Sequence, residues 1–129
     1  MTGRVSLAVG CGAALGSVLR YLVGVAVVAA GWPTFIATGL VNLLGSFVIG
    51  FVATISGPDG RLLVGPAARQ LVMAGLCGGL TTFSTMSLDA FRMLAEHRLA
   101  AALLYLAAVV LGSVGAAFLG HLLAARLNR

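Results

Sequence analysis

Four long apolar runs, joined by short polar connections, constrain this chain more than any other feature. Each run is long enough to cross the hydrocarbon core of a bilayer as a helix, which takes about 20 residues. The runs cover residues of about 5–30, 34–55, 70–95 and 99–122. Turn-forming residues separate them, as in Gly31-Trp32-Pro33 and in the Pro-Asp-Gly of the Ser56–Arg61 segment. We therefore predict an all-α membrane protein with a single four-span domain over residues 1–129.

The composition agrees with a membrane protein and excludes several other classes. Hydrophobic residues make up 60% of the chain and charged residues 9%, whereas a soluble domain carries about 25% charged residues. All cations are arginines, and most lie near the ends of the runs, where they meet anionic headgroups rather than nucleic acid. Arg4 before an apolar run also resembles a signal peptide, but the run continues past Arg20 without a clear cleavage site. We expect a first span here.

The third run carries an unusual block, Gly75-Leu-Cys-Gly-Gly-Leu-Thr-Thr-Phe-Ser-Thr-Met86. A helix facing lipid would carry leucine and valine here instead of glycines and hydroxyls. Backbone groups in hydrocarbon must be satisfied internally, so a helix is broken there only where protein or a cavity accepts the freed groups. Such breaks usually mark ion or substrate sites. We predict that the third helix is broken at mid-membrane and that the protein moves a small solute.

Catalytic and metal-binding chemistry finds little support in the sequence. The acids and histidines are few and scattered: Asp59, Asp89, Glu96, His97 and His121. They form no Ser-His-Asp arrangement, and no glycine-rich phosphate loop follows a strand. Cys11 and Cys77 both fall inside runs, which favours small buried side chains over a disulfide framework. We expect a protein that is not an enzyme.

Small residues recur four positions apart within the runs, as at Gly12 and Gly16, at Ser46 and Gly50, and at Ala116 and Gly120. This spacing lets helix backbones approach closely in lipid. The chain has no internal inverted repeat, the usual origin of a midplane site in transporters. We therefore expect a compact bundle that oligomerises.

Polar groups inside the runs are functional candidates, although each also has a structural interpretation. Arg20 either snorkels or bonds carbonyls within the bundle, or it supplies positive charge to an anion vestibule. Asn42 either makes an interhelical hydrogen bond or faces a pathway. Phe83 and Met86 lie three apart and so share a helix face, and Tyr105 and Ser113 share a face of the fourth run.

Three motifs together resemble the Fluc (CrcB-type) family of fluoride channels. They are the Gly75–Met86 block, Gly16-Ser-Val-Leu-Arg20-Tyr21, and Thr38-Gly-Leu-Val-Asn42-Leu-Leu-Gly45-Ser-Phe-Val-Ile-Gly50. Their order, the length and the four spans all fit, so the resemblance covers nearly the whole chain. It implies a fluoride-selective passive channel of the plasma (inner) membrane that exports cytoplasmic fluoride and reduces its toxicity.

The resemblance also implies an assembly and a set of site residues. Two subunits would insert in opposite orientations, with the third helix broken near Gly78 to Thr81. Backbone carbonyls of Gly78 and Thr81 from both subunits would enclose a structural Na⁺, a hard cation suited to oxygen ligands. Arg20 would lie in a vestibule or play a structural part. The pore residues would be Asn42, Phe83, Ser84, Thr85, Met86, Tyr105 and Ser113.

This chain departs from the family pattern at two positions. Met86 stands where the family commonly has a second phenylalanine, and Val109 stands where it has a hydroxyl. The pore face is therefore poorer in anion contacts than the family pattern. Asp89 matches an acidic position of the family, for which the sequence indicates no role.

Two other functions compete with the channel. A small multidrug exporter is also a four-span antiparallel dimer, but it needs a carboxylate in the first span, where this chain has Arg20. The other is a membrane subunit without transport.

Charge at the span ends bears on the partner subunit. One side holds Arg4, Arg61, Arg69, Arg126 and Arg129, and the other holds Arg92 and Arg98. This bias favours cytoplasmic termini. The partner is then either a second copy with dual topology or a homologous chain of opposite orientation.

Overall fold

The computed structural model describes residues 2–129 and contains helices but no strand over that range. The helices are α1 (Thr2–Ala29), α2 (Thr34–Ile55), α3 (Pro66–Gln70), the π-helix η1 (Leu71–Cys77), α4 (Gly78–Leu80), α5 (Phe83–Ala95) and α6 (Leu99–Leu127). Four stretches are long and apolar enough to cross a membrane: Gly3–Ala29, Thr34–Ile55, Pro66–Ala95 and Leu99–Leu127. The predicted all-α class with four spans is confirmed.

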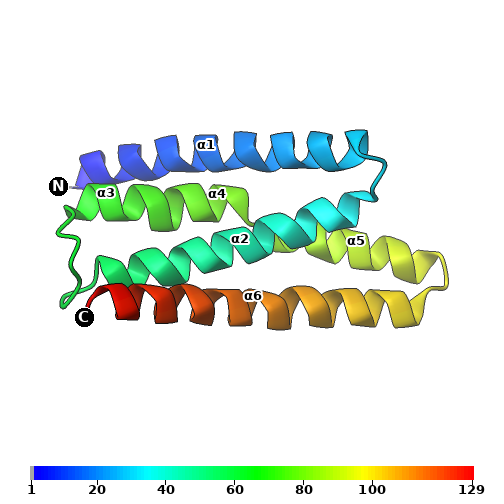
Figure 1. The fold of residues 1–129 in the computed structure, drawn as a ribbon. Coiled ribbons are helices and arrows are strands. Elements are labelled where there is room, and N and C mark those ends of the chain that lie inside the picture. Colours follow the sequence, from blue (N-terminus) through cyan, green and yellow to red (C-terminus); the bar gives the residue numbers. More distant parts are fainter. Residues whose placement is uncertain (1) are drawn as a thin grey trace.

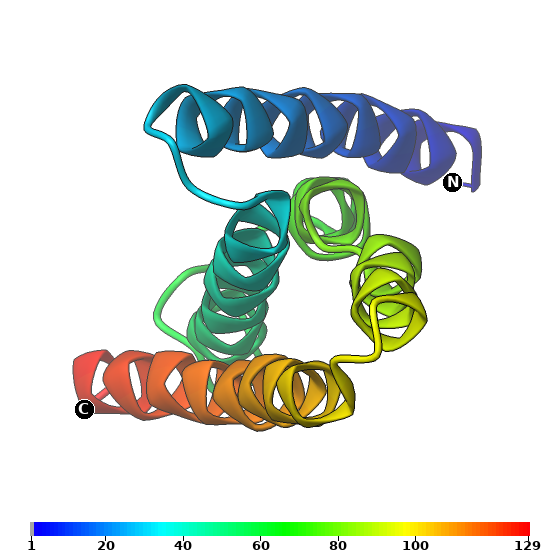
Figure 2. The same cartoon turned by 90° about the vertical axis from the view of Figure 1, so that its right-hand side faces the viewer.

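The four spans lie roughly along one direction, with the two termini at the same end of the bundle (Figure 1). The α2–α3 connection also lies at that end, and the α1–α2 and α5–α6 connections lie at the other. We call the end that holds the two termini and the α2–α3 connection the basic end. The opposite end, with the α1–α2 and α5–α6 connections, is the far end. In the end-on view of Figure 2, α1 and α6 lie on opposite sides, with α2 and the third span between them.

Glycines set the two closest helix contacts. On α1, a Cβ added at Gly12 or Gly16 would collide with backbone atoms of the third span. On the other side of the bundle, a Cβ at Gly50 would collide with the backbone of Ala117 in α6, and one at Gly120 with the backbone of Phe47 in α2. These positions confirm the close approach predicted from the glycine spacing.

The third span is helical on both sides of an extended step. Thr81 (φ −78°, ψ 156°) and Thr82 (φ −153°, ψ 118°) have extended backbone, so the helix ends at Leu80 and begins again at Phe83. The predicted break near Gly78 to Thr81 overlaps the observed one at Thr81, although the observed break continues to Thr82 and Gly78 itself is helical (φ −63°, ψ −37°). The helix is interrupted at this point because the Thr82 amide bonds the Asn42 side chain and the Thr82 hydroxyl accepts from the Thr85 amide, whereas the Thr81 amide still makes the helical bond to the Cys77 carbonyl at 2.9 Å.

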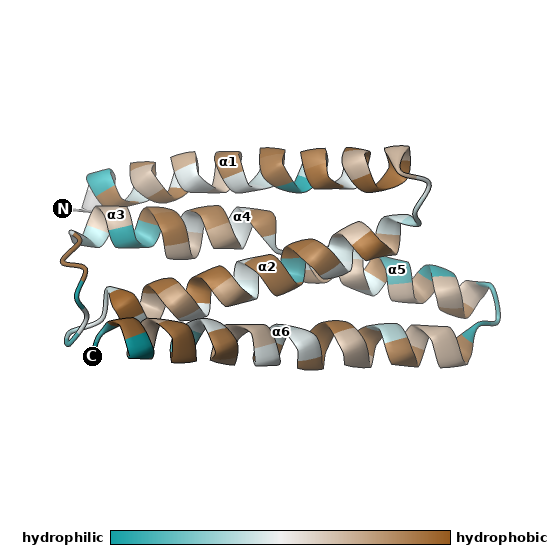
Figure 3. Ribbon diagram, in the orientation of Figure 1, coloured by the Kyte–Doolittle hydropathy of each residue, from teal (hydrophilic) through white to brown (hydrophobic). Residues whose placement is uncertain are grey.

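The core within the subunit is small and lies between α5 and α6, around Met86, Met93, Tyr105 and Val109. Most large apolar side chains are instead exposed, and hydrophobic residues recur along all four spans (Figure 3). A soluble protein buries such residues, whereas a bundle in lipid leaves them facing the hydrocarbon.

The connection between the third and fourth spans is Glu96–Arg98, since α5 continues to Ala95. One detail of the sequence interpretation is wrong. Cys11 is exposed rather than buried, since α1 packs on only one side; Cys77 is buried, and both cysteines are free.

Candidate functional site

Asn42 holds the interruption of the third span from the side of α2. Its Oδ1 accepts a hydrogen bond from the Thr82 amide at 2.7 Å, and its Nδ2 donates to the Thr82 carbonyl at 3.1 Å. Both residues are buried. One side-chain amide thus satisfies the two backbone groups of a residue that has left the helix, which is what a break in hydrocarbon requires.

Thr82 caps the helix that follows the break. Its Oγ1 accepts a hydrogen bond from the Thr85 amide at 3.1 Å, which satisfies one of the unpaired N–H groups at the start of α5. The same hydroxyl donates to Thr85 Oγ1 at 3.0 Å and lies 3.2 Å from Ser84 Oγ. Three hydroxyls therefore meet at one helix start.

These side-chain bonds leave two carbonyls without their usual partners. In a continuous helix the Thr82 amide would donate to the Gly78 carbonyl and the Thr85 amide to the Thr81 carbonyl. Here the amides donate to Asn42 and to the Thr82 hydroxyl instead. The Thr81 carbonyl accepts a long bond from Arg20 Nη1 at 3.4 Å. The two carbonyls expected to bind a cation are therefore among those that the break frees, together with the Gly79 and Leu80 carbonyls of the last helical turn.

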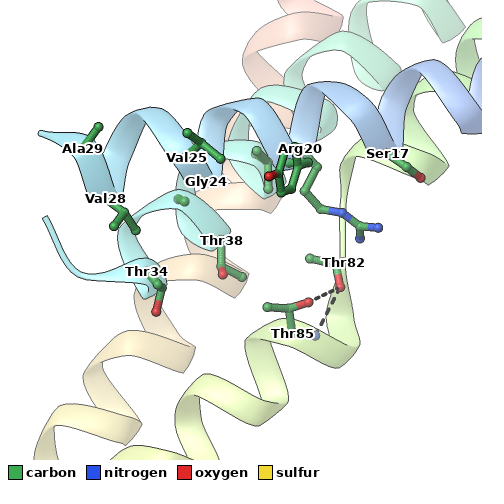
Figure 4. A pocket seen from close by; sticks show the side chains of 13 residues that line it. Ser17, Arg20, Gly24, Val25, Val28, Ala29, Thr34, Thr38, Thr82 and Thr85 are labelled. Atoms are coloured by element: carbon green, nitrogen blue, oxygen red, sulfur yellow. Dashed lines mark hydrogen bonds between the residues drawn. The ribbon is translucent and has the colours of Figure 1, made fainter.

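A cavity of about 750 Å³ lies on one side of the break, between α1, α2 and the start of α5. Figure 4 shows Thr82 and Thr85 on one wall, with Arg20 and Ser17 of α1 facing them and Thr38 of α2 beyond. Its lining is mostly apolar, with Val25, Val28 and Val41 among the wall residues, and hydroxyl groups and a single guanidinium are set into it. Arg20 and Thr85, two residues of the predicted site, both line this cavity.

A second cavity, of about 500 Å³, lies on the other side of the break, between α2, α5 and α6. Asn42, Phe83, Met86 and Ser113 of the predicted site all line it, and so does Thr82, which borders both cavities. Phe83 is 77% exposed whereas Met86 is 4% exposed. The two residues share a cavity as expected, but Met86 belongs to the subunit core and Phe83 faces outward.

Tyr105 lies apart from both cavities, beside a buried carboxylate. Its hydroxyl donates to Asp89 Oδ2 at 3.3 Å, and the Thr38 hydroxyl donates to the same oxygen at 2.8 Å. Arg92 Nη1 is 4.0 Å from the other carboxylate oxygen. The Phe35 ring meets the Tyr105 ring edge-on, with centroids 5.7 Å apart. Two hydroxyls and a distant guanidinium therefore compensate the buried Asp89.

Sequence reasoning missed three residues of this arrangement: Thr82, Thr38 and Asp89 as a bonded acceptor. The signal for Thr82 was present, because a threonine directly before a helix that restarts is a typical N-cap. The Thr38–Asp89 pair had no signal, since 51 positions separate the two residues along the chain.

Over residues 2–129 no group of three His, Cys, Asp or Glu side chains could hold a metal.

Comparison with known proteins assigns the chain to a family. Residues 7–121 match the family model described as "CrcB-like protein, Camphor Resistance (CrcB)". A protein of Brucella abortus named "Fluoride-specific ion channel FluC 3" is 54% identical over 127 residues, covering 98% of this chain and 93% of the relative.

Two more distant relatives agree over nearly the same span. "Fluoride-specific ion channel FluC 1" of Rhodopseudomonas palustris is 48% identical over 122 residues, covering 94% of this chain and 86% of the relative. "Fluoride-specific ion channel FluC" of Gluconobacter oxydans is 41% identical over 132 residues, covering 99% and 90%. The chain belongs to the CrcB family.

Proposed function

We propose that this chain is a subunit of a fluoride-selective passive channel in the plasma membrane. The observation that carries the proposal is the interrupted third span, whose freed backbone groups and hydroxyls border two cavities. The chain also belongs to a family with relatives that are named as fluoride channels. Family membership favours a channel over an enzyme, over a multidrug exporter and over a subunit without transport.

Fluoride is small and strongly hydrated, so its pathway must replace water with hydrogen-bond donors that bind adequately but not tightly. The side chains around the break can do this. Asn42 Nδ2 carries two N–H bonds and uses one for the Thr82 carbonyl, which leaves one donor. The Thr85 hydroxyl accepts from Thr82 and keeps its own proton to donate. The positive edge of the Phe83 ring can also face an anion.

The direction of transport follows from the membrane potential. Hydrogen fluoride enters neutral, ionises in the less acidic cytoplasm and is trapped as the anion. A potential of about 100 mV, negative inside, is worth about 2.3 kcal/mol per charge, which expels the anion roughly 50-fold. A passive pathway is therefore sufficient for export.

Efflux from vesicles tests passive transport. Purified protein in potassium fluoride vesicles should release fluoride when valinomycin lets potassium follow, and release little without it. The expected rate with valinomycin is the same with and without a pH gradient. Release that needs a proton gradient would instead indicate a coupled exporter, and no release under any condition would indicate a subunit without transport.

Phe83 offers a sharp test of the assigned pathway. Phe83→Ile should reduce fluoride efflux at least tenfold without altering the unfolding temperature, because the side chain is exposed in the subunit and isoleucine keeps its apolar bulk. Phe91→Ile is the matched control, since Phe91 is a second exposed phenylalanine on α5 that borders neither cavity at the break. Equal efflux from both variants would place the anion pathway elsewhere.

The Gly78 and Thr81 carbonyls also support a structural Na⁺ shared with a second subunit. A hard cation takes oxygen ligands, and these two oxygens are among those freed by the break, the Thr81 oxygen accepting only the long bond from Arg20 at 3.4 Å. A Cβ at Gly78 would meet nothing within 4 Å in the subunit, so this position is open to a partner. Purification with N-methylglucamine in place of sodium should lower the unfolding temperature of the assembly. An unchanged temperature would contradict the sodium site.

The second subunit is then an oppositely oriented copy or a homologous chain. Single cysteines at Asp59→Cys of the basic end and Glu96→Cys of the far end, both exposed positions, distinguish these cases in a Cys11→Ser, Cys77→Ala background. With the chain expressed alone, labelling of both ends from both sides together with fluoride efflux would indicate a dual-topology homodimer. One fixed orientation without efflux would indicate an obligate second chain.

A further inference from the structure

The α2–α3 connection at the basic end exposes a short apolar segment between arginines. Leu62, Leu63 and Val64 lie between Arg61 and Arg69 in the sequence. Leu63 is 92% exposed and Leu62 is 52% exposed. The connection joins two spans, so it lies where the bilayer meets water. An apolar segment with flanking cations at that depth is suited to enter the headgroup region rather than to remain in water.

Beside this segment the structure has a cavity of about 690 Å³. Leu62 and Leu63 form part of its wall, together with Ser56 and Arg69. The Arg69 guanidinium is fixed there, because its Nε donates to Ser56 Oγ at 3.2 Å and its Nη2 donates to the Ala53 carbonyl at 3.5 Å. Those bonds use one edge of the group. Its remaining N–H donors are held in place next to the cavity and suit two oxygens of one phosphate, to which a guanidinium can donate a pair of hydrogen bonds.

The charge around the cavity is strongly positive. The side chains near the basic end include Arg4, Arg61, Arg69, Arg126 and Arg129, and the only acidic side chain there is Asp59, which does not line the cavity. Within residues 2–129 the structure has two ion pairs, Arg92–Asp89 and Arg98–Glu96, and both lie in the half of the bundle toward the far end. No carboxylate therefore neutralises Arg69.

We propose that this cavity binds the phosphate headgroup of an anionic phospholipid, with Arg69 on the phosphate and Leu62 and Leu63 inserted among the acyl chains. The site is separate from the fluoride pathway, because none of the residues at the break lines it. It lies in whichever leaflet adjoins the basic end, so it does not depend on the orientation of the subunit.

A fluorescent reporter in the loop tests the site. Trp32 is the single tryptophan and lies at the far end, so Trp32→Phe with Leu63→Trp leaves one reporter beside the cavity. This protein is reconstituted in phosphatidylcholine vesicles in which a rising fraction of either brominated phosphatidylcholine or brominated phosphatidylglycerol replaces the host lipid. Both lipids should quench, since the loop enters the bilayer. Half-quenching by phosphatidylglycerol should need about fivefold less lipid, as expected for one basic residue at an anionic headgroup.

Substitutions at Arg69 and Arg126 in the reporter background distinguish a specific headgroup site from a general effect of the positive charge at the basic end. Arg69→Gln should bring the two quenching curves together, and Arg69→Lys should retain part of the difference because it keeps the charge. Arg126→Gln removes an exposed cation of the same end that does not line the cavity, and should leave most of the preference intact. All variants should keep the parent emission spectrum in pure phosphatidylcholine.

Three results would overturn the proposal. Identical curves for the two lipids in the parent would exclude a headgroup preference. An equal loss in Arg69→Gln and Arg126→Gln would mean that the basic end acts only through its overall charge. An absence of quenching by either lipid would show that the loop stays in water.

Discussion

The α2–α6 contact and the interrupted third span are both rich in glycine, but they use it differently. Between α2 and α6, Gly50 and Gly120 bring two continuous helices into backbone contact, and each helix satisfies its own hydrogen bonds. In the third span Gly75 and Gly79 make the same kind of contact with α1, yet the helix then ends. Side chains from Asn42 and Thr82 must replace its missing hydrogen bonds.

The difference shows that glycine spacing by itself indicates packing and not function. The α2–α6 pair has glycines with apolar neighbours and forms a scaffold. The third span has glycines followed by hydroxyls, and there the backbone becomes available to a ligand. In this fold the polar side chains next to the glycines, and not the glycines themselves, mark the site.

The largest effect is expected from adding a methyl group to the scaffold. In Gly50→Ala the new Cβ would collide with the Ala117 backbone, which cannot move without separating α2 from α6. Overpacking of this kind costs about 3 kcal/mol, and little monodisperse protein should be recovered by size-exclusion chromatography. Gly115→Ala on α6 is the control, since its Cβ would meet nothing within 4 Å. Normal recovery of Gly50→Ala would show that the α2–α6 contact is looser than described.

A smaller effect is expected at the clamp on the break. Asn42→Leu leaves the buried Thr82 amide without its acceptor, which costs about 2 kcal/mol and should lower the unfolding temperature in detergent. Fluoride efflux should fall as well, because a donor is lost. Ser46→Ala, one turn further along α2 and bordering the same cavity, should change stability little. Wild-type stability in Asn42→Leu would mean that the break does not depend on this amide.

The smallest effect is expected at the helix cap. Thr82→Val keeps the shape of the side chain but removes the oxygen that accepts from the Thr85 amide, at a cost of about 1 kcal/mol. Thr82→Ser restores the oxygen and should restore the unfolding temperature. If Thr82→Val and Thr82→Ser both unfold at the wild-type temperature, the cap contributes nothing to stability and Asn42 alone holds the interruption.

Much of the architecture could be predicted because it follows from local composition. The apolar runs and their turns gave four spans, and the glycine spacing gave the close helix contacts at Gly12, Gly16, Gly50 and Gly120. The interruption itself followed from glycines and hydroxyls in an otherwise apolar run. Its predicted position, near Gly78 to Thr81, overlaps the observed one at Thr81 and Thr82. Glycine permits a break, whereas the hydrogen bonds of Thr82 decide where it falls.

The polar pairings could not be predicted because they join residues far apart in the sequence. Asn42 was singled out as an amide in a span, but the sequence does not show that both of its polar atoms bond Thr82. Likewise Asp89 had no assigned role until Thr38 and Tyr105 were found to donate to it. The roles of Phe83, Ser84, Thr85, Met86 and Ser113 in the pore stay predictions.

The central claim is that this chain forms a pathway selective for fluoride, and paired efflux measurements test it most directly. Wild-type protein is reconstituted in vesicles loaded with potassium fluoride or potassium chloride, and valinomycin is added to each. We expect the fluoride vesicles to empty while the chloride vesicles retain their anion, because a pathway narrow enough to replace the water around fluoride with protein donors is too narrow for the larger anion. Equal release of both anions would contradict it, since a wide, water-filled pore does not discriminate between them.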